Sequence, residues 1–334
     1  MAFKDIVVSG TRPTGNLHLG NYLGAVKHFV RMQDEFESYF FIADYHSLTT
    51  HPRPGDLAQN VRTVLVEYLA AGLDPEKTTI YVQSDVPQIA ELYLILNMFA
   101  YMGELERVAT FKEKARAHPE NINAGLLTYP TLMAADILIH RGTKVPVGKD
   151  QEQHLEMTRT FARRFNNVYE AEVFPEPQAI NPAGGALIKV PGLDGGGKMS
   201  KSGEESSVIY LKDTPEVITK KVMRAVTDAG PSAPGTPKSQ GVQNLFDLMQ
   251  HVSAPEVTAH FEETYNAMTI RYGDMKKQVA ADMATFLAPL RERIAALESD
   301  SAYLNKVMEE GKEKARASAQ KTIEEARKVM GLRG

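Results

Sequence analysis

The sequence predicts an α/β protein in which a doubly wound parallel sheet is followed by an all-helical C-terminal domain. Apolar runs of strand length alternate with helical patterns through the first half of the chain, as parallel strands joined by helical crossovers require. A glycine-rich turn at residues 9–21 separates the first strand from the first helix, which is typical of phosphate-binding sites. From Val242 onward only helix patterns occur. We therefore expect one domain at residues 1–205 and a second, mostly helical one at residues 206–334.

The spacing of apolar residues predicts the individual elements. The expected strands are residues 5–9, 38–44, 78–84 and 144–147, with a last strand at residues 208–211. The expected helices, most of which repeat apolar residues every three or four positions, are residues 57–72, 89–99, 125–139, 151–165 and 214–224, and a further apolar face spans residues 275–294. The charged residues 104–124 form either a solvated helix with a mobile loop or an insertion that meets a partner subunit or a substrate.

Composition limits the possible classes of function. The chain has 334 residues, enough for one large domain and a smaller one. It contains no cysteine, so disulfides, thiol nucleophiles and cysteine-ligated zinc are excluded. Its net charge of −4 means that a nucleic acid would have to bind a local basic patch. No segment approaches the length of a membrane span and the N-terminus lacks a leader pattern, so we expect a cytoplasmic enzyme without a membrane partner.

Two stretches carry side chains suited to phosphate chemistry. The first turn holds His18 and Asn21, which can form hydrogen bonds with phosphate oxygens. Residues 194–203 combine three glycines, expected to act as a mobile hinge, with Lys198 and Lys201. Mobile cations of this kind can close over a leaving group as negative charge develops on it. A lysine–serine loop alone is typical of an exposed turn, and its pairing with the first turn favours the catalytic interpretation.

Asp136 is an acid in the middle of an otherwise apolar helix. Burying an unpaired carboxylate costs several kcal/mol, so this side chain needs either a protein partner, such as Arg141, or a ligand that donates a hydrogen bond. The residues alone favour neither possibility. Tyr129 and Met133 precede Asp136 by seven and three positions, which places them on roughly the same helical face.

Polar residues also follow two of the predicted strands, where parallel sheets bind ligands. His46 follows residues 38–44, and by itself it is interpreted as a loop histidine. Gly148 ends another strand and permits close approach of a ligand, while Asp150 beside it can accept from ribose hydroxyls. His154 is interpreted as structural, because no other metal-type ligand is suitably spaced.

Both motifs resemble the signature elements of a known class of enzyme. His18-Leu-Gly-Asn21 is similar to the "HIGH" element of class I aminoacyl-tRNA synthetases, with Asn in the last place, and Lys198-Met-Ser-Lys-Ser202 matches their "KMSKS" element letter for letter. From end to end the chain resembles the bacterial-type tryptophanyl-tRNA synthetases. Further matching stretches are residues 24–25, 103–107, 126–130, 133–138, 145–148, 150–151 and 225–228. This resemblance implies a Rossmann-like nucleotide-binding domain followed by a helical region that includes the anticodon-binding part.

The resemblance also implies roles for individual residues. The implied catalytic residues are His18, Asn21, Lys198 and Lys201. The implied ATP-binding residues are Arg12, Pro13, Thr14, Gly20, Asn21, Gly148, Lys149, Asp150, Leu187, Lys198, Met199, Ser200, Lys201 and Ser202. The implied tryptophan-binding residues are Asp136, Tyr129, Met133, His46, Val145, Val147 and Gln151. The chain departs from the family pattern at Arg12, where many relatives carry Gln, and at Thr110, where some carry Gln.

The implied reaction is ATP-dependent activation of L-tryptophan to tryptophanyl-AMP with release of pyrophosphate, followed by transfer to tRNA(Trp). Mg²⁺ is expected to arrive with ATP, without protein ligands, and the family suggests a homodimer. The chemistry of the residues agrees, because indole offers one donor and no acceptor, so an apolar slot with a single buried carboxylate selects it. An analogue without the donor would leave that carboxylate unpaired and would be rejected.

Three alternatives remain. A tyrosyl-tRNA synthetase shares the fold and both motifs, and a tyrosine hydroxyl can also donate to an aspartate, although the block around Asp136 favours tryptophan. A non-catalytic paralogue could bind tRNA or an amino acid as a regulator, but His18, Lys198 and Lys201 are all present. A simple nucleotidyltransferase of the same lineage would not need the long helical C-terminal part.

Overall fold

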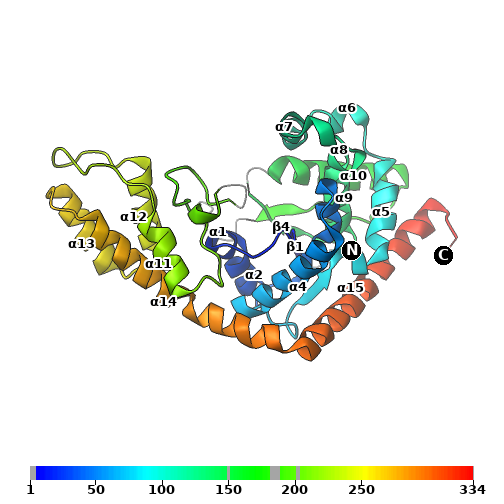
Figure 1. The fold of residues 1–334 in the computed structure, drawn as a ribbon. Coiled ribbons are helices and arrows are strands. Elements are labelled where there is room, and N and C mark those ends of the chain that lie inside the picture. The colour runs from blue at the N-terminus through cyan, green and yellow to red at the C-terminus, as the bar shows by residue number, and fades with distance from the viewer. Residues whose placement is uncertain (1–4, 149–150, 181–188, 201–203, 334) are drawn as a thin grey trace.

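The predicted parallel sheet is confirmed. The structure is a computed structural model that describes residues 5–148, 151–180, 189–200 and 204–333 (Figure 1). Within these ranges five parallel strands form one sheet, in the order β3-β2-β1-β4-β5. Their bounds are β1 (Ile6–Thr11), β2 (Glu37–Ile42), β3 (Thr79–Val82), β4 (Lys144–Pro146) and β5 (Gln178–Ile180). The strand order reverses between β1 and β4, so ligands are expected to bind at the carboxyl ends of these strands.

Helices cover both faces of the sheet and make up all the named elements after residue 204. Their bounds are α1 (Leu19–Asn21), the π-helical η1 (Tyr22–Val26), α2 (Lys27–Met32), α3 (Asp44–Ser47), η2 (Leu48–Thr50), α4 (Pro54–Ala71), η3 (Gln83–Asp85), α5 (Pro87–Asn97), α6 (Met102–Leu105), α7 (Ala109–Ala117), η4 (Pro119–Asn121), α8 (Ala124–Leu127), α9 (Tyr129–Leu138), α10 (Glu152–Val168), η6 (Glu205–Ser207), α11 (Pro215–Met223), α12 (Gln240–Val252), α13 (Pro255–Asn266), α14 (Tyr272–Ser299) and α15 (Ser301–Met330). None of these helices combines the length and apolar character needed to cross a membrane.

Successive residues of the central strands enter two different cores, which explains the consecutive apolar residues at the start of β1 and at the end of β2. In β1, Val7 packs in the core that contains α4, while Val8 packs in the core that contains α5, α9 and α10. Phe40 and Phe41 of β2 divide in the same way. Side chains alternate across a strand, so a sheet covered by helices on both faces needs apolar residues at every position.

The predicted last strand at residues 208–211 is wrong. Its apolar side chains are buried, but Tyr210 makes only an isolated antiparallel bridge, with His18. The fifth strand is instead β5, which pairs with β4. This strand has three residues, two of them exposed, so it carries no apolar run by which it could be recognised.

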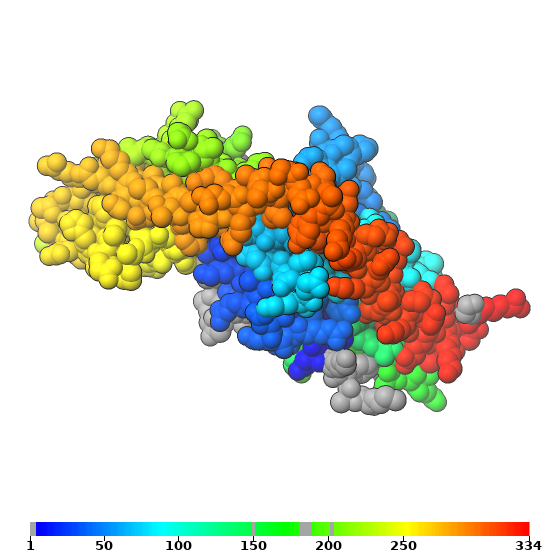
Figure 2. Space-filling view, turned by 90° about the horizontal axis from the view of Figure 1, so that it is seen from below, coloured from blue at the N-terminus to red at the C-terminus, as the bar shows by residue number. Residues whose placement is uncertain are grey.

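The C-terminal helix α15 packs along β3 and α5 of the sheet domain (Figure 1). Figure 2 shows α14 and α15, orange to red, as a continuous band beside the blue and cyan residues of the first half of the chain. Arg327 of α15 forms two hydrogen bonds of 2.6 Å with the carboxylate of Glu91 in α5. Helix α15 therefore contacts the sheet although it follows the helical region in sequence, and the division at residue 205 stays a prediction.

We expect Gly311→Ala to lower the free energy of unfolding by about 1–3 kcal/mol, the usual cost of overpacking. A Cβ on Gly311 of α15 would lie 1.7 Å from the carbonyl oxygen of Ile80 in β3, so the helix would have to move away from the strand. Urea unfolding measures the difference. Gly273→Ala in α14 is the matched control, because its Cβ would meet nothing within 4 Å. Equal stability of the two variants would contradict this contact.

A buried histidine joins α15 to the sheet. His140, just after α9, shares hydrogen bonds with the Tyr81 hydroxyl (2.9 Å) and with Ser318 Oγ of α15 (3.1 Å). Its ring stacks on Tyr39 at a centroid distance of 4.1 Å. Burial lowers the pKa of His140 from 6.5 to about 3, so the folded protein holds this ring neutral.

The free energy of unfolding should therefore fall at mildly acidic pH. Because the folded pKa of His140 lies below the unfolded value, the neutral ring contributes stability above pH 6.5 that is lost as pH falls toward 3. Between pH 7 and pH 5 this loss is about 2 kcal/mol, and His140→Gln should remove it. Urea unfolding at both pH values tests this. His118→Gln, whose parent side chain is 70% exposed, should keep the wild-type pH dependence. A His140→Gln variant that loses as much stability as wild type would refute the assignment.

Candidate active site

The turn that carries His18 is fixed by its own hydrogen bonds. His18 is the N-cap of α1, and its Nδ1 accepts from the backbone N–H of Asn21 at 3.2 Å. In return, the His18 backbone N–H donates to Asn21 Oδ1 at 3.2 Å. This reciprocal capping box holds both side chains in defined positions. The helix continues as the π-helical η1, a conformation that is rare and frequent at functional sites.

The backbone of the turn is bound to two other segments. The N–H of Leu17 donates to the buried carboxylate of Glu67 in α4 at 2.8 Å. The Leu19 N–H donates to the Ile209 carbonyl at 2.8 Å, and the Leu211 N–H donates to the Leu17 carbonyl at 3.1 Å. The apolar run at residues 208–211, which was predicted as a strand, therefore supports the His18 turn instead.

Gly20 brings the His18 turn and the lysine loop together. A Cβ on Gly20 would lie 2.9 Å from His18 Nδ1 and 3.6 Å from Val190 Cβ. The Val190 carbonyl accepts from the Met199 N–H at 2.8 Å, within the Lys-Met-Ser-Lys-Ser motif. The two motifs are therefore neighbours in space, and glycine at position 20 leaves room for the histidine ring.

The glycines before Lys198 form a closed hairpin turn. The Gly192 N–H donates to the Gly197 carbonyl at 3.0 Å, and Pro191 and Lys198 form an antiparallel bridge. Asp194 Oδ1 accepts from the Gly196 N–H at 2.9 Å. The Lys198 side chain is exposed whereas Met199 is buried, so the methionine anchors the segment and the lysine faces outward.

Several predicted ATP-binding residues lie outside the residues that the structure describes. They are Lys149, Asp150, Leu187, Lys201 and Ser202. Of the remaining ones in the first turn, Pro13 is buried and Thr14 is exposed, with the Thr14 N–H donating to the Arg12 carbonyl at 2.9 Å. Ser200 is also exposed.

A cavity of about 210 Å³ lies at the carboxyl ends of β1, β2 and β4, where the strand order reverses. All seven residues implied to bind tryptophan line it: His46, Tyr129, Met133, Asp136, Val145, Val147 and Gln151. Arg12 and Gly148, from the implied ATP set, line it as well. The apolar walls include Val8, Phe41 and Ile137, which the sequence analysis did not identify.

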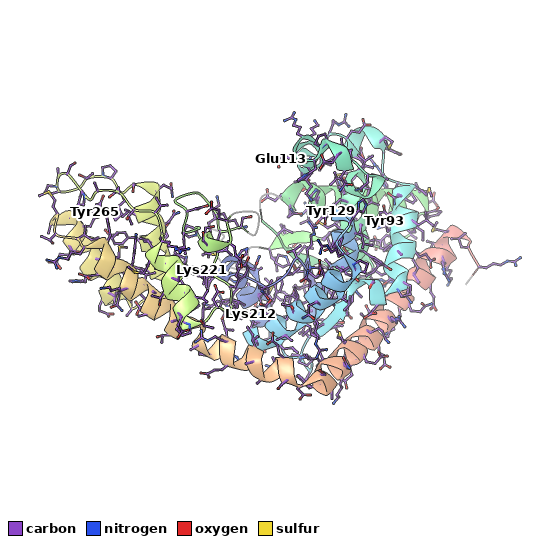
Figure 3. All side chains as sticks on the ribbon, viewed as in Figure 1. Tyr93, Glu113, Tyr129, Lys212, Lys221 and Tyr265 are labelled. Atoms are coloured by element: carbon purple, nitrogen blue, oxygen red, sulfur yellow. The ribbon has the colours of Figure 1, made fainter. Side chains whose placement is uncertain are left out.

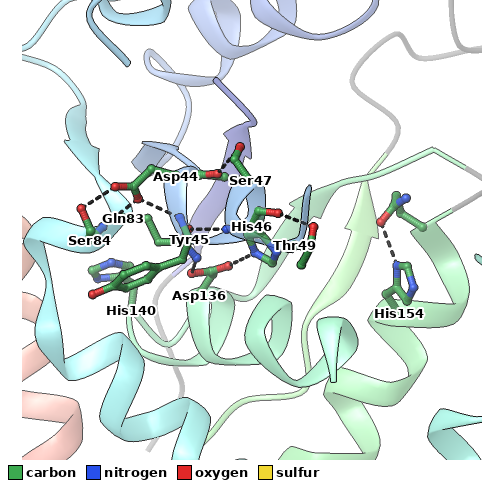
Figure 4. A network of polar contacts seen from close by, with 12 residues as sticks. Asp44, Tyr45, His46, Ser47, Thr49, Gln83, Ser84, Asp136, His140 and His154 are labelled. Atoms are coloured by element: carbon green, nitrogen blue, oxygen red, sulfur yellow. Dashed lines mark hydrogen bonds and ion pairs between the residues drawn. The ribbon is translucent and has the colours of Figure 1, made fainter. Parts of the chain in front are cut away.

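Asp136 borders this cavity and is fully buried, and Figure 4 shows its polar contacts. Its carboxylate accepts from His46 Nε2 at 2.7 Å and from Gln83 Nε2 at 2.7 Å. Burial raises the pKa of Asp136, and the two hydrogen bonds oppose that shift. Arg141, the alternative partner, pairs with Glu325 of α15 instead. The carboxylate therefore lies beside the cavity with polar partners that orient it.

Two of these residues acquire significance only in the folded chain. His46 resembles a loop histidine in sequence, but it is buried in α3 against Asp136. Gln83 was missed, and its position directly after β3, at the same edge of the sheet as His46, is the only signal that could have indicated it. Asp44 supports both, because its Oδ1 accepts from the backbone N–H groups of Tyr45 and Ser84 at 3.0 Å (Figure 4).

The charged segment at residues 104–124 contributes a further cation. Lys114 of α7 lines a second cavity of about 180 Å³, which shares Tyr129 and Gln151 with the first. Its Nζ lies 5.1 Å from the centroid of the Tyr129 ring. Burial and the positive charge of Arg12 lower the pKa of Lys114. Lys114 does not stand out in the sequence, because charge runs usually mark solvated helices.

Thr110, one of the two departures from the family pattern, is linked to the cavity through His154. Thr110 Oγ1 lies 2.9 Å from His154 Nε2, and His154 Nδ1 lies 2.8 Å from Gln151 Oε1. His154 also lines the second cavity, so the structural role predicted for it stays a prediction. Among the described residues, no group of three or more His, Cys, Asp or Glu side chains could hold a metal ion.

The basic helix α11 lies on the helical side of the molecule (Figure 3). Lys221 Nζ forms hydrogen bonds with Asp213 Oδ2 at 2.7 Å and with the Val208 carbonyl at 2.9 Å. Lys220 and Arg224 are exposed. Lys221 therefore stabilises the segment that supports the His18 turn, whereas its two basic neighbours face outward.

Comparison with known proteins identifies close relatives. The family model described as tRNA synthetases class I (W and Y) matches residues 4–288. A tryptophan–tRNA ligase of Porphyromonas gingivalis is 60% identical over 329 residues, which are 98% of this chain and all of the relative. The tryptophanyl-tRNA synthetase of Campylobacter jejuni, crystallised with ADP and tryptophan, is 33% identical with a TM-score of 0.85, over 98% of this chain and all of that one. The Mycoplasma pneumoniae tryptophanyl-tRNA synthetase is 30% identical, with a TM-score of 0.82 over 99% of both chains.

Proposed function

Since this chain belongs to the class I tRNA synthetases (W and Y), and within them to the bacterial-type tryptophanyl-tRNA synthetases, we propose that the cavity beside Asp136 binds L-tryptophan and that the His18 and Lys198 loops act on ATP. Its activity is that of a tryptophan–tRNA ligase, which forms tryptophanyl-AMP and transfers the aminoacyl group to tRNA(Trp). One observation carries the assignment of the site: residues from β4, α3, α9 and the start of α10 converge on a single cavity that contains a buried carboxylate.

Asp136 selects the indole ring in this proposal. Its oxygens are held by His46 and Gln83, and each carboxylate oxygen can accept more than one hydrogen bond. The indole N–H donates to this carboxylate, while Met133, Val145 and Val147 surround the ring. Tyr129 and Gln151 lie toward the second cavity and bind the amino group. Arg12 supplies positive charge near the α-carboxylate, in place of the uncharged amide of other family members.

The activation step needs positioning and charge neutralisation and no general base. The α-carboxylate of tryptophan is ionised at neutral pH, so its oxygen attacks the α-phosphorus of ATP directly. A P–O bond to the α-phosphorus forms as the bond to pyrophosphate breaks. His18 and Asn21, fixed by their capping box, stabilise charge on the α-phosphate.

Lys198 and Lys201 neutralise the departing pyrophosphate. Lys198 is exposed on a hairpin beside the His18 turn, so it can reach a triphosphate bound there. Mg²⁺ enters with ATP, because phosphate oxygens are ligands that it prefers, and it supplies further charge neutralisation.

The second step transfers the aminoacyl group from the adenylate to the terminal ribose of tRNA(Trp). We propose that the helical region contacts the tRNA, with Lys220 and Arg224 of α11 available for its phosphates. We also propose a cytoplasmic location, because charged tRNA is consumed there by translation.

We propose that the enzyme is a homodimer whose interface is an apolar patch on α5 and its surroundings. The patch consists of five side chains that are 58–71% exposed: Leu94, Met98, Tyr101, Met102 and Val168. Large exposed apolar groups at helical spacing are typical of interfaces. Sedimentation should give a dimer for wild type and a monomer for Met98→Glu. Met268→Glu, at an exposed methionine after α13, is the control and should remain dimeric. A monomeric wild type would reject the homodimer.

Pyrophosphate exchange with ATP tests the function as a whole. Exchange should depend on tryptophan and not on tyrosine, and the enzyme should then charge tRNA(Trp). Tyrosine-dependent exchange would indicate a tyrosyl-tRNA synthetase. Absence of exchange with either amino acid would indicate a non-catalytic paralogue. Exchange without charging would indicate a nucleotidyltransferase-like activity.

A further inference from the structure

Asn244 of α12 binds the hairpin turn that precedes Lys198. Its side chain is 2% exposed. Its Nδ2 donates to the Gly192 carbonyl at 3.0 Å and to the Gly196 carbonyl at 2.9 Å. These two carbonyls lie on opposite arms of the turn, which is itself closed by the hydrogen bond between Gly192 and Gly197. One amide group therefore bridges both arms of the hairpin.

The orientation of the Asn244 amide is set by its neighbour one helical turn earlier. Gln240 Nε2 donates to Asn244 Oδ1 at 2.8 Å, so the NH₂ group must point at the hairpin. An aspartate in this place could not donate to the two carbonyls, and an apolar side chain would leave them without this donor. The site therefore requires a side-chain amide.

The helix and the hairpin also approach each other closely. Val226 contacts both, because its N–H donates to the Leu193 carbonyl of the hairpin at 3.0 Å and a Cβ on Gly241 would lie 2.4 Å from its carbonyl oxygen, so only glycine fits at position 241. A Cβ on Gly195, whose φ is +76°, would lie 3.8 Å from the Gly241 Cα. The turn is thus seated on the first residues of α12, and its position depends on that helix.

We propose that Asn244 is a positioning residue for Lys198. It fixes the hairpin so that the lysine can reach the departing pyrophosphate. Gly197, which takes part in the closure of the turn, directly precedes Lys198 in the chain. Loss of the amide would leave the two arms joined by the backbone bond alone, so the lysine would visit its productive position less often. This inference rests on the function proposed for Lys198, and it adds Asn244 as the residue that acts through that lysine.

A double-mutant cycle tests this proposal. Asn244→Ala should lower kcat for tryptophan-dependent pyrophosphate exchange by about 10- to 100-fold, as expected for a small misplacement of a catalytic group. In the Lys198→Ala background, the same substitution should lower kcat by less than about 2-fold, because the group it positions is already absent. If the fold-losses of kcat in the two single variants multiply in the double variant, Asn244 does not act through Lys198, and the proposal is overturned.

Tryptophan-binding measurements separate positioning from a general structural effect. The chain contains no tryptophan, so the fluorescence of added tryptophan reports its binding directly. Asn244→Ala should bind tryptophan as wild type does. If its tryptophan affinity falls as far as kcat, Asn244 has a merely structural role.

Two further variants keep the test valid if Asn244→Ala folds poorly. Gln240→Ala alters an exposed residue and frees the amide to rotate, so it should lower kcat less than Asn244→Ala does, with an unchanged KM for tryptophan. Gln243→Ala removes a hydrogen bond to Asp247 on the same helix, which does not reach the hairpin, and should keep the wild-type kcat. Equal kcat values for wild type, Gln240→Ala and Gln243→Ala would overturn the proposal.

The function proposed for Lys198 and the positioning role of Asn244 can be disproved separately. If Lys198→Ala leaves kcat unchanged, the proposed function of the lysine loop is wrong, and Asn244 loses its role with it. If Lys198→Ala lowers kcat but Asn244→Ala does not, the function stands and only the positioning role is wrong.

Discussion

Replacing Lys198 with alanine is expected to lower kcat for tryptophan-dependent pyrophosphate exchange by about 10²- to 10³-fold, the usual cost of removing one group that stabilises transition-state charge. The affinity for tryptophan should not change, because Lys198 is absent from the residues that line the Asp136 cavity. Negative charge on pyrophosphate develops only as the P–O bond breaks, so the lysine acts mainly in the transition state. Exchange kinetics and tryptophan fluorescence measure the two quantities in the same preparation.

Lys212→Ala is the matched control for this experiment. Lys212 is exposed in the segment just before α11 (Figure 3), and we assign it no part in catalysis. Its substitution changes the net charge by the same amount but should leave kcat unchanged. Equal losses of kcat and of tryptophan affinity in Lys198→Ala would mean that the loop merely binds substrate.

Asp136→Asn is expected to lower kcat/KM for tryptophan by about 10- to 150-fold, because a hydrogen bond to a charged group contributes about 1.5–3 kcal/mol. The best comparison substrate is the analogue in which sulfur replaces the indole N–H. Wild type should strongly prefer tryptophan to this analogue, whereas Asp136→Asn should prefer it less, because an uncharged amide oxygen is a weaker acceptor than a carboxylate. Unchanged discrimination in the variant would show that Asp136 does not recognise the N–H group.

The stability of Asp136→Asn distinguishes recognition from a structural role. Burial raises the pKa of Asp136 above its value in the unfolded chain. The group therefore favours the folded state at pH values below about 3.8, and this contribution is lost as pH rises through the folded pKa, so the ionised carboxylate opposes folding at neutral pH. Urea unfolding at pH 7 should find the variant at least as stable as wild type. A clear loss of stability would mean that the bonds to His46 and Gln83 serve the fold.

Much of the fold followed from local patterns, and the exceptions have a common cause. The first four strands and the long helices are recognisable because apolar residues repeat with the period of the element. Residues 208–211 share the apolar character of a strand, yet they support the His18 turn, because burial alone does not specify a partner. Strand β5 is the opposite case. It pairs with β4 through its backbone, although its sequence has no apolar run that would mark it as a strand.

The residues of the candidate site likewise fall into those that the sequence indicated and those that only the structure revealed. Resemblance indicated the seven residues around the Asp136 cavity and the two loops, because short motifs keep their spacing in sequence. Three further groups were not indicated: Gln83 beside Asp136, Lys114 in the neighbouring cavity and Asn244 under the hairpin. Each belongs to a residue type that is common on protein surfaces, so nothing in its local sequence marks it.

By itself the sequence determined the class of fold, the two motifs and the chemistry that they imply, because these depend on residues close together in the chain. Only the tertiary structure decided that Asp136 pairs with His46 and Gln83 and not with Arg141, and that Lys114 faces a cavity. It also decided that the lysine hairpin is seated on Asn244, which is 48 and 52 positions away from its two partners. Such contacts are set by how whole elements pack, and no local pattern encodes them.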